Sequence, residues 1–421
     1  MMRWGYLCGD PGIPALGDKG ASIHVRQVVA ALREAGDEVL LLARGRSGAV
    51  GATGTPSEAS PGLWLSAEPS SAPRWRAVPP DQDGLARDLT ALAGMRRFGR
   101  AAAPVLRAHA PDLLYERLSL FGAAGLGLAR RQGLPLLLEV NAPLVEEQAR
   151  WRGLHLRPAA ARVEDEVLRG ADRVLVVSQS LADWAQTRGV PAGRIVVLPN
   201  GVDPRPFAVD PAAVTAQRQT IGLRPGPVLG FVGGLRPWHG VAGLLEASAR
   251  LRDQGHAFQL LIVGDGPLRA ELAALSQSLG LAEWVRFTGA VPHEAVPALL
   301  ALMDVTVAPY ASGGDGGFYF SPLKVFEYMA AARPVVAADI GQLRAIVKTE
   351  HTGLLYRAGD AAALAEAIGR LLDDPQQAQR MGRQALETVW AEHTWASRAQ
   401  TIRELGSDLL RERAVGHRRA A

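Results

Sequence analysis

Short apolar runs alternate with longer amphipathic segments along most of the chain, a pattern typical of βαβ units and parallel sheets. In the first half the apolar runs predict strands at 4–8, 38–43, 113–115, 136–140 and 173–177. The second half restarts the alternation and predicts strands at 228–232, 259–263, 285–288, 305–308 and 335–337. We therefore expect an α/β fold with two parallel-sheet domains.

The segments between these runs carry helix signals. Residues 25–35 follow the first strand and predict a helix that Gly36 ends. A second clear helix is expected over 267–280, because leucines at four positions fall on one face and a glycine closes the segment.

At 421 residues the chain is too long for one ordinary core, so two domains are expected. The first is predicted at 1–190 and the second at 191–385, with turn chemistry at 199–204 marking the linker. Residues 386–421 are expected to form a helix that packs back on the first domain and ends in a basic tail. Residues 44–84 are rich in Gly, Ser, Ala and Pro and predict a long surface loop or a partly disordered insert in the first domain. We expect the two domains to face each other across a cleft. Ligands of such sheets bind at the carboxyl ends of the strands, where the glycine-rich turns are predicted.

Composition narrows the class of protein. The chain is 48% hydrophobic and 21% charged, which is typical of a globular protein. No run of about 18 apolar residues predicts a membrane span, and the first eight residues predict a strand rather than a signal peptide. Cys8 is the only cysteine, so no intrachain disulfide can form and a cytoplasmic location fits best. The net charge of +4 does not imply a nucleic-acid partner, and the arginine-rich tail is either a frayed end or a peripheral contact with the inner face of an anionic membrane.

The segment 321–330 predicts a helix that begins at an anion site. Ser321 is a good N-cap, and Pro322 suits the first helical position, where its missing N–H costs nothing. Leu323 begins the apolar face of this helix. Lys324 lies in the first turn, where the helix dipole disfavours a cation unless a phosphate is bound. The alternative is a solvated lysine on an ordinary surface helix.

The use of lysine supports the anion site. Among 46 basic residues, lysine appears only at Lys19, Lys324 and Lys348. Two of the three lie in segments typical of phosphate loops, where a compact point charge fits better than the planar fork of arginine. Three residues are a small sample, so the bias is supporting evidence only.

Glycine-rich turns follow several predicted strands. The loop 9–20 ends in Lys19 and Gly20, and a helix with His24 in its first turn is expected after it. The spacing is not Gly-x-Gly-x-x-Gly, so the loop lacks the dinucleotide fingerprint. A flexible loop without a ligand, and a histidine without a catalytic role, are the alternatives.

A second turn, 231–240, places Gly233 and Gly234 before Arg236, whose guanidinium can bind two phosphate oxygens. The alternative role of Arg236 is a surface ion pair. Trp238 is expected to pack, and Asp265, in a third turn, is expected to shape the turn or to cap the next helix.

Glu327 lies in the helix predicted at 321–330, between apolar neighbours. A carboxylate there could accept hydrogen bonds from both hydroxyls of a ribose. The alternative is a surface glutamate, but the apolar neighbours indicate partial burial, and a buried carboxylate needs partners.

These motifs, in this order, resemble those of the family 4 glycosyltransferases, which are retaining enzymes of the GT-B fold with two Rossmann-like domains. The resemblance covers nearly the whole chain and lies in the segments 17–22, 199–203, 233–235, 263–267, 321–330 and 333–336. It implies transfer of a hexosyl group from a UDP- or GDP-sugar to a carbohydrate or lipid-linked acceptor, in the synthesis of a surface polysaccharide, glycoconjugate or glycosylated metabolite. It also implies an acceptor-binding first domain, a donor-binding second domain, no metal and no cofactor besides the donor.

The resemblance also assigns roles to residues. Glu327 matches the second glutamate of the family's Glu-x7-Glu motif and would bind ribose, while backbone around Val291 would recognise the base. Arg236 and Lys324 would neutralise the diphosphate leaving group. The remaining donor-side residues, which act mainly through their backbone, would be Gly20, Gly233, Gly234, Ser321, Pro322 and Leu323. The acceptor-side residues would be Lys19, His24, Glu139 and Asn141, the last standing where the family has a histidine.

The chain departs from the family pattern at three further positions. Tyr319 stands where the first glutamate of the motif is expected, and Asp315 could contact the sugar hydroxyls in its place. Gly234 replaces the usual arginine and His239 the usual lysine, so Arg236 is expected to supply the missing charge.

Other functions stay open at this stage. An epimerase or phosphorylase on the same architecture, or a non-catalytic sugar-nucleotide-binding partner, would share these motifs. The sequence 81–83 has the Asp-x-Asp form of a metal site, but it lies in the proline-rich insert and not at a strand end. The base, the sugar and the acceptor are not specified by the sequence.

Overall fold

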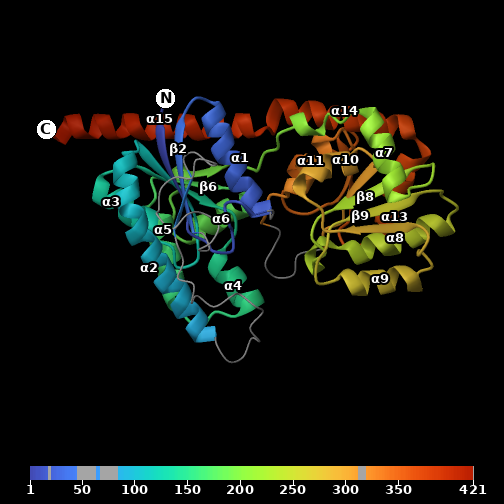
Figure 1. The fold of residues 1–421 in the computed structure, drawn as a ribbon, viewed down its shortest axis with the longest axis horizontal. Helices are drawn as coiled ribbons and strands as arrows, with labels where there is room; N and C mark the ends of the chain where they lie inside the picture. The colour runs from blue at the N-terminus through green and yellow to red at the C-terminus, as the bar shows by residue number, and fades with distance from the viewer. Residues whose placement is uncertain (18–19, 45–62, 67–83, 312–318, 421) are drawn as a thin grey trace. The chain divides into compact units, whose positions relative to one another are not determined.

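A computed structural model describes residues 1–17, 20–44, 63–66, 84–311 and 319–420. The chain divides into two compact units, Met1–Pro199 with Trp395–Ala421, and Asn200–Thr394. Each unit contains one parallel sheet with helices packed against it (Figure 1). Of the helices in the described residues, none is long and apolar enough to cross a membrane.

The first unit has a seven-stranded sheet in the order β3-β2-β1-β4-β5-β6-β7. Its strands are β1 (Arg3–Cys8), β2 (Glu38–Arg44), β3 (Leu63–Ser66), β4 (Leu113–Arg117), β5 (Leu136–Val140), β6 (Arg173–Val176) and β7 (Ile195–Val197). Its helices are α1 (Gly20–Glu34), α2 (Gly84–His109), α3 (Ala124–Gln132), α4 (Leu144–Arg152), α5 (Arg157–Gly170), α6 (Gln179–Thr187), the 3₁₀ turn η1 (Ala192–Arg194) and α15 (Trp395–Ala420).

The second unit has a six-stranded sheet in the order β10-β9-β8-β11-β12-β13. Its strands are β8 (Val228–Val232), β9 (Gln259–Val263), β10 (Val285–Gly289), β11 (Val305–Ala308), β12 (Val335–Ala338) and β13 (Gly353–Tyr356). Its helices are α7 (Pro211–Ile221), α8 (Val241–Asp253), α9 (Arg269–Ser278), α10 (Val296–Leu300), α11 (Leu323–Ala330), α12 (Leu343–Ile346), α13 (Ala361–Asp373) and α14 (Pro375–Glu392), with 3₁₀ turns η2 (Arg205–Phe207), η3 (Pro237–His239) and η4 (His293–Ala295).

All ten predicted strands are present, and three further strands lie at sheet edges. The edge strands β3, β7 and β13 have only three or four residues each, so they give little apolar signal in the sequence. The expectation of an unbroken loop over 44–84 is therefore wrong at 63–66, which pairs with β2. The first helix begins at Gly20, five residues before the predicted segment 25–35 and close to the start expected directly after the loop 9–20.

The domain limits in the structure differ from those expected. Strand β7 pairs with β6, which extends the first unit to Pro199 instead of residue 190. Helix α14 continues to Glu392 within the second unit, so the last helix begins at Trp395 instead of residue 386.

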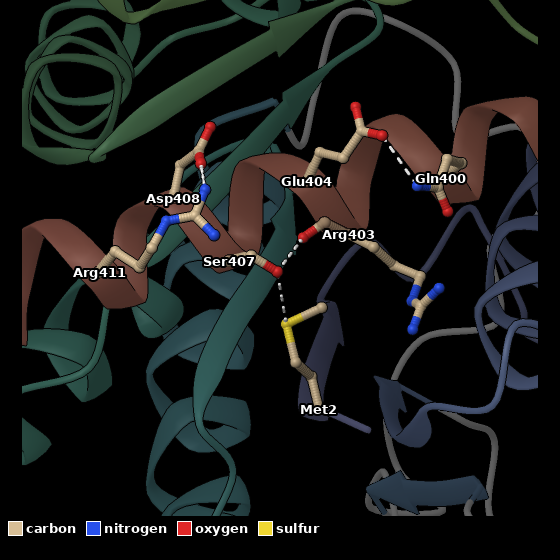
Figure 2. A pocket seen from close by; sticks show the side chains of 7 residues that line it. All are labelled: Met2, Gln400, Arg403, Glu404, Ser407, Asp408 and Arg411. Carbon is tan, nitrogen blue, oxygen red and sulfur yellow. Dashed lines mark hydrogen bonds and ion pairs between the residues drawn. The ribbon is translucent and has the colours of Figure 1, made fainter.

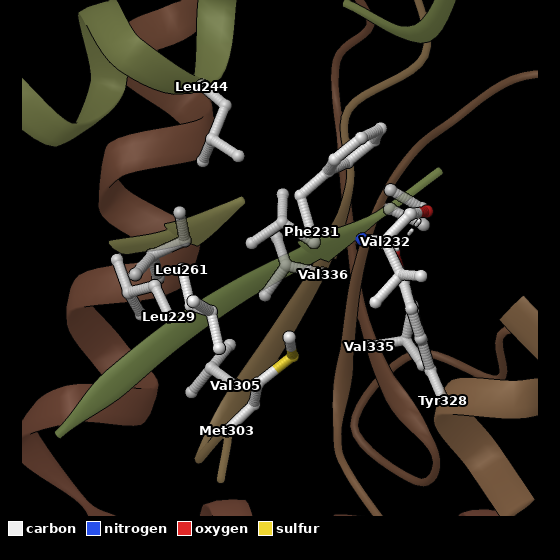
Figure 3. Packing of buried hydrophobic residues seen from close by; sticks show 14 of the residues in the cluster. Leu229, Phe231, Val232, Leu244, Leu261, Met303, Val305, Tyr328, Val335 and Val336 are labelled. Atoms are coloured by element: carbon white, nitrogen blue, oxygen red, sulfur yellow. Dashed lines mark hydrogen bonds between the residues drawn. The ribbon is translucent and has the colours of Figure 1, made fainter. Parts of the chain in front are cut away.

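The core of the second unit is built from the apolar strand runs. Figure 3 shows Phe231 of β8 and Leu244 of α8 among the buried side chains that surround Val336 of β12. Gly230 in β8 leaves room for Met303, because a Cβ at that position would lie 1.8 Å from the Met303 sulfur. The strand therefore needs glycine there to keep native packing density.

In the first unit, α15 packs beside α1 against the sheet. Arg403 donates to Asp37 at 2.9 Å, and the same buried carboxylate accepts the indole N–H of Trp4 at 3.0 Å. Farther along the helix, the Ser407 hydroxyl donates to the Arg403 carbonyl and contacts the Met2 sulfur at the edge of a shallow hollow (Figure 2). These contacts tie the end of the chain to its beginning.

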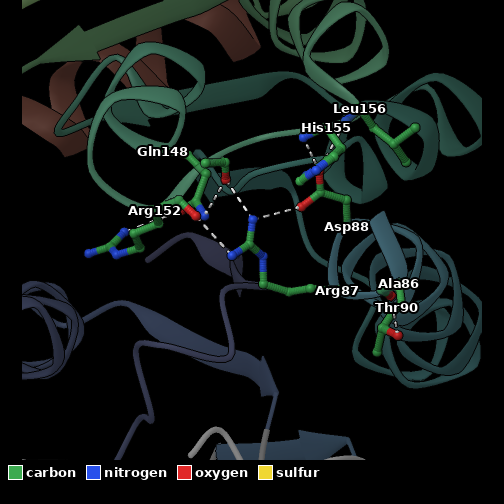
Figure 4. Close-up of polar contacts among 9 residues, drawn as sticks. Ala86, Arg87, Asp88, Thr90, Gln148, Arg152, His155 and Leu156 are labelled. Carbon is green, nitrogen blue, oxygen red and sulfur yellow. Dashed lines mark hydrogen bonds and ion pairs between the residues drawn. The ribbon is translucent and has the colours of Figure 1, made fainter. Parts of the chain in front are cut away.

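Polar contacts fix the α4–α5 connection, which follows the end of β5. The buried Asp88 of α2 accepts the backbone N–H groups of His155 and Leu156 at 2.7 and 3.0 Å. Arg87 donates to the carbonyls of Arg152 and Gly153 (Figure 4). The N-terminus of α2 therefore positions the α4–α5 connection, which lies in the segment that follows Asn141.

Candidate functional site

Two glycine turns meet at the carboxyl ends of β8 and β9. Gly233 has φ +146° and its N–H donates to the Val263 carbonyl at 2.9 Å. Gly264 has φ +129°, and a Cβ there would lie 2.1 Å from the Gly233 oxygen. Because neither glycine carries a side chain, the two turns pack in direct backbone contact, and the Lys324 nitrogen can approach Gly233. The switch in strand order between β8 and β11, where ligands of such sheets bind, lies beside these turns.

Helix α11 is pinned to this edge by Tyr328. Its hydroxyl accepts the Val232 N–H at 2.8 Å and donates to the Val232 carbonyl at 3.2 Å (Figure 3). Lys324 lies one turn earlier on the same face of the helix. The lysine nitrogen therefore comes to the neighbouring Gly233, where a Cβ would lie only 2.5 Å from it.

The Lys324 ammonium lies beside two aromatic rings. Its nitrogen is buried and has no hydrogen-bond partner among the described residues. It lies 4.3 Å from the centre of the Phe231 ring and 5.2 Å from that of Tyr310. Burial lowers the pKa of Lys324 to about 7, against the opposing effect of Glu327. A buried cation without a bonded partner is suited to an anionic ligand.

The start of α11 differs from the prediction. Ser321 is not the N-cap, because the helix begins at Leu323 after Pro322 and no side chain of the described residues caps it. Instead the Ser321 hydroxyl accepts the Asn200 N–H at 3.1 Å, and the Asn200 amide donates to the Ser321 carbonyl at 2.8 Å. In the first turn of α11 the Val325 N–H donates to the Pro322 carbonyl at 3.0 Å, and no side chain of the described residues caps the N–H groups before it.

Glu327 lies three residues after Lys324, and its side chain is 16% exposed. Burial raises the pKa of Glu327, while the neighbouring His293 and Lys324 oppose that rise. The Nδ1 atom of His293 lies 3.8 Å from the Glu327 carboxylate. His293 follows Val291, which is half-buried against the core.

Arg236 and His239 do not supply a second buried cation. Arg236 is exposed, and its guanidinium lies over the ring of Trp238 at 5.8 Å. Trp238 thus stacks under an arginine while 38% of it stays exposed. Burial, with lesser effects of Lys324 and Arg236, lowers the pKa of His239 to about 3, so the ring is neutral and its Nδ1–H donates to the Gly234 carbonyl. Asp265 shapes its turn by accepting the Gly266 N–H.

In the first unit, Glu139 is the centre of a buried polar cluster. Its carboxylate accepts from the Tyr115 hydroxyl at 2.6 Å, from the Arg117 guanidinium at 2.5 Å and from the Asn141 amide. His24 Nε2 lies 2.8 Å from the same carboxylate. Burial opposes the charge of Glu139, but the adjacent His24 and Arg117 outweigh it and hold the pKa far below its usual range.

His24 and Glu139 are covered by protein. They are 5% and 3% exposed, and the His24 ring packs edge-on against Trp395 at 5.1 Å. Asn141 is half-buried and is the most accessible member of this cluster. The Glu139 carboxylate therefore does not face solvent. Its hydrogen bonds orient the neighbouring side chains, of which Asn141 is the accessible one.

The other predicted site residues are placed as follows. Gly20 is the exposed first residue of α1, and Tyr319 is half-buried with its ring edge-on to Phe320. Lys19, Asp315 and the Asp-x-Asp sequence at 81–83 lie outside the described residues. Among the described residues, no three His, Cys, Asp or Glu side chains lie close enough to hold a metal.

Comparison with known proteins identifies the family. Residues 19–205 match the model of Glycosyltransferase Family 4, and residues 226–374 match that of Glycosyl transferases group 1. The chain is 32% identical over 300 residues to the 2-deoxystreptamine glucosyltransferase of Streptomyces kanamyceticus, covering 70% of this chain and 74% of that protein.

The chain belongs to glycosyltransferase family 4. It is also 31% identical to the 2-deoxystreptamine N-acetyl-D-glucosaminyltransferase of Streptomyces fradiae, covering 88% of each protein. The Anabaena protein Alr3699/HepE, solved in complex with UDP-glucose, superimposes with a TM-score of 0.70 at 22% identity over 97% of this chain and all of that one. The predicted fold class, two Rossmann-like domains of the GT-B type, and the predicted glycosyltransferase class are confirmed.

Two contributors to the candidate site of this glycosyltransferase were missed in the sequence. His293 lies in a 3₁₀ turn 34 residues before Glu327, and Asn200 lies 121 residues before its partner Ser321. The Pro-Asn-Gly-Val-Asp sequence at 199–203 marked the region of Asn200, but only the fold shows that its amide holds the segment before α11.

Proposed function

We propose that this glycosyltransferase moves a hexosyl group from a UDP- or GDP-sugar to a hydroxyl of a carbohydrate, cyclitol or lipid-linked acceptor, with retention of anomeric configuration. The observation that carries the donor class is the buried Lys324 nitrogen, which lies against Gly233 without a hydrogen-bond partner among the described residues. A diphosphate bound there would supply the missing counter-charge. The two relatives named above act, by their names, on 2-deoxystreptamine, which supports a polyhydroxylated acceptor.

In this proposal the second unit holds the leaving group. Lys324 and the uncapped amides at the start of α11 stabilise the negative charge that grows on the diphosphate as the bond to the sugar breaks. The ribose hydroxyls donate to Glu327. Arg236, exposed at the same turn, contributes to the outer side of the diphosphate. No metal is required in this scheme, because these groups carry the charge.

The acceptor would bind at the first unit. Asn141 is the group of the Glu139 cluster that would meet an acceptor hydroxyl, while Glu139 and His24 orient it from beneath. The attacking hydroxyl would approach from the face that the diphosphate leaves, and a donor phosphate oxygen would take its proton. A protein nucleophile is then unnecessary. A cytoplasmic setting with peripheral membrane contact is part of this proposal.

The proposal is tested with Lys324→Ala and Glu327→Ala. A thermal-shift panel of UDP-, GDP-, ADP- and TDP-sugars first identifies the donor, since a ligand of the native state raises its apparent stability. Lys324→Ala should then lower donor turnover by about 100-fold or more while changing donor affinity less, because the leaving-group charge is greatest in the transition state. Glu327→Ala should chiefly weaken nucleotide binding. Equal turnover of parent and Lys324→Ala would refute the assignment.

A further inference from the structure

His293 is the histidine nearest to the carboxylate assigned to ribose. It opens the 3₁₀ turn η4, after the carboxyl end of β10, and its Nδ1 lies 3.8 Å from Glu327 Oε1. The imidazole is 30% exposed, whereas the Glu327 side chain is 16% exposed. A ligand at this edge would therefore meet the histidine and the carboxylate together.

Glu327 needs a positive neighbour in order to stay ionised. Burial alone favours its protonated form, and the groups that face it are His293 from η4, Lys324 and Tyr328 from its own helix, and the Tyr310 hydroxyl after β11. The two tyrosines are neutral, so two cations can oppose the cost of burial. Lys324 lies against Gly233 and would be engaged by the diphosphate, which leaves His293 as the counter-charge of the carboxylate.

We propose that His293 is a positioning residue for ribose recognition, whose ring beside the carboxylate holds Glu327 ionised and turned to accept both ribose hydroxyls. An ionised carboxylate has acceptors for two hydroxyl donors, whereas its protonated form presents a competing O–H. This inference rests on the proposed function, because it assumes that the ligand is a nucleoside diphosphate.

The preference for ribose over 2′-deoxyribose isolates this contact. UDP, GDP and ADP are each compared with the 2′-deoxy counterpart by titration calorimetry between pH 5.5 and 9. The ratio of the two dissociation constants cancels titration of Lys324 and of the diphosphate, since both ligands carry the same phosphates. The parent should prefer the ribonucleotide by about 10-fold, since an unpaired buried carboxylate is costly.

Removal of the His293 ring should move the pH range of this preference. In His293→Gln the pKa of Glu327 rises, so the preference should be lost at neutral pH and return only at higher pH. The midpoint is the pH at which the ratio of the two dissociation constants is halfway between its limits. It should shift upward by about one pH unit or more, as expected for loss of an opposite charge within about 4 Å. His293→Lys keeps a positive charge and should keep the midpoint near that of the parent.

His351→Gln is the matched control. His351 is exposed in the same unit, at the amino end of β13, on the side of the sheet away from the site. Its variant should show the ratio and midpoint of the parent. Thermal unfolding of each variant checks that it is folded.

The outcomes separate the two proposals. A parent that binds none of the three diphosphates overturns the proposed function. A parent that binds them with a ribose preference whose midpoint is unchanged in His293→Gln overturns the role of His293 alone. A parent without ribose preference at any pH removes Glu327 from the ribose and the inference with it. A midpoint that rises in His293→Gln and is restored in His293→Lys supports the inference.

Discussion

Gly233→Ala tests the close approach of backbone and lysine on which the proposed donor site depends. At φ +146° an alanine is strained, and such backbone strain costs about 1–3 kcal/mol. The new Cβ would also lie 2.5 Å from the Lys324 nitrogen, so the lysine must withdraw from the turn. We expect the free energy of unfolding to fall by about 2 kcal/mol, which corresponds to a fall of about 4–8 °C in the melting temperature of a unit of this size.

The same substitution should impair transfer more than folding. A withdrawn lysine no longer lies at the diphosphate, so donor turnover at saturating donor should fall by about 10-fold or more. The assay is calorimetric melting together with transfer measured on the donor that the thermal-shift panel identifies. Gly243→Ala is the control, because Gly243 lies in α8 with nothing within 4 Å of a new Cβ. It should stabilise the protein by about 1 kcal/mol and leave turnover unchanged.

A double-mutant comparison separates strain from the lysine contact. In a Lys324→Ala background the backbone strain of Gly233→Ala stays, but the contact with the lysine is gone, so the loss of stability should be smaller. An equal loss in both backgrounds would show that the lysine does not lie against this glycine. Parent-like stability and turnover in Gly233→Ala would refute the reasoning altogether.

Two further predictions concern protons. When a nucleoside diphosphate binds at pH 8, the protein should take up a proton, because an anion beside Lys324 raises the pKa of the lysine from about 7. The binding enthalpy should then depend on the ionisation enthalpy of the buffer. An undiminished dependence in Lys324→Met would contradict the assignment. Burial, against backbone N–H groups of Gly125 and Leu126, raises the pKa of Glu116 from 4.5 to about 7, so the native state holds its proton more tightly than the unfolded chain. Stability should fall as the pH rises from about 4.5 to 7, and urea unfolding at pH 5 and 7.5 should show a smaller fall in Glu116→Gln.

The sequence predicted the elements whose signals are local. The central strands carry apolar runs and are buried on both faces, and the helix with Lys324 and Glu327 was evident from its start signals and apolar face. The short edge strands were missed because three or four residues carry too little pattern. Ser321 was assigned as a cap because serine is common there, but its hydroxyl binds Asn200, which no local rule brings near it.

The charge distribution of the site was predictable only in part. Arg236 was expected to replace a missing arginine because it is close in sequence, yet it lies exposed over Trp238. The buried charge comes instead from Lys324, whose place depends on the bond between Tyr328 and Val232 across 96 residues. His293 meets Glu327 only after β10 and α11 are both in place, so no spacing rule indicates the pair.

The two anchors of α11, Asn200 at Ser321 and Tyr328 at Val232, exist before any ligand arrives. Because the site is already formed, the Lys324 ammonium loses its water when the protein folds and not when a ligand binds. Under the proposed function, the empty enzyme is less stable than it would be with an apolar residue in place of Lys324, and a bound diphosphate supplies the missing counter-charge. In that proposal the protein gives up some stability at Lys324 in exchange for turnover, a trade-off that stabilising substitutions at active sites commonly reveal.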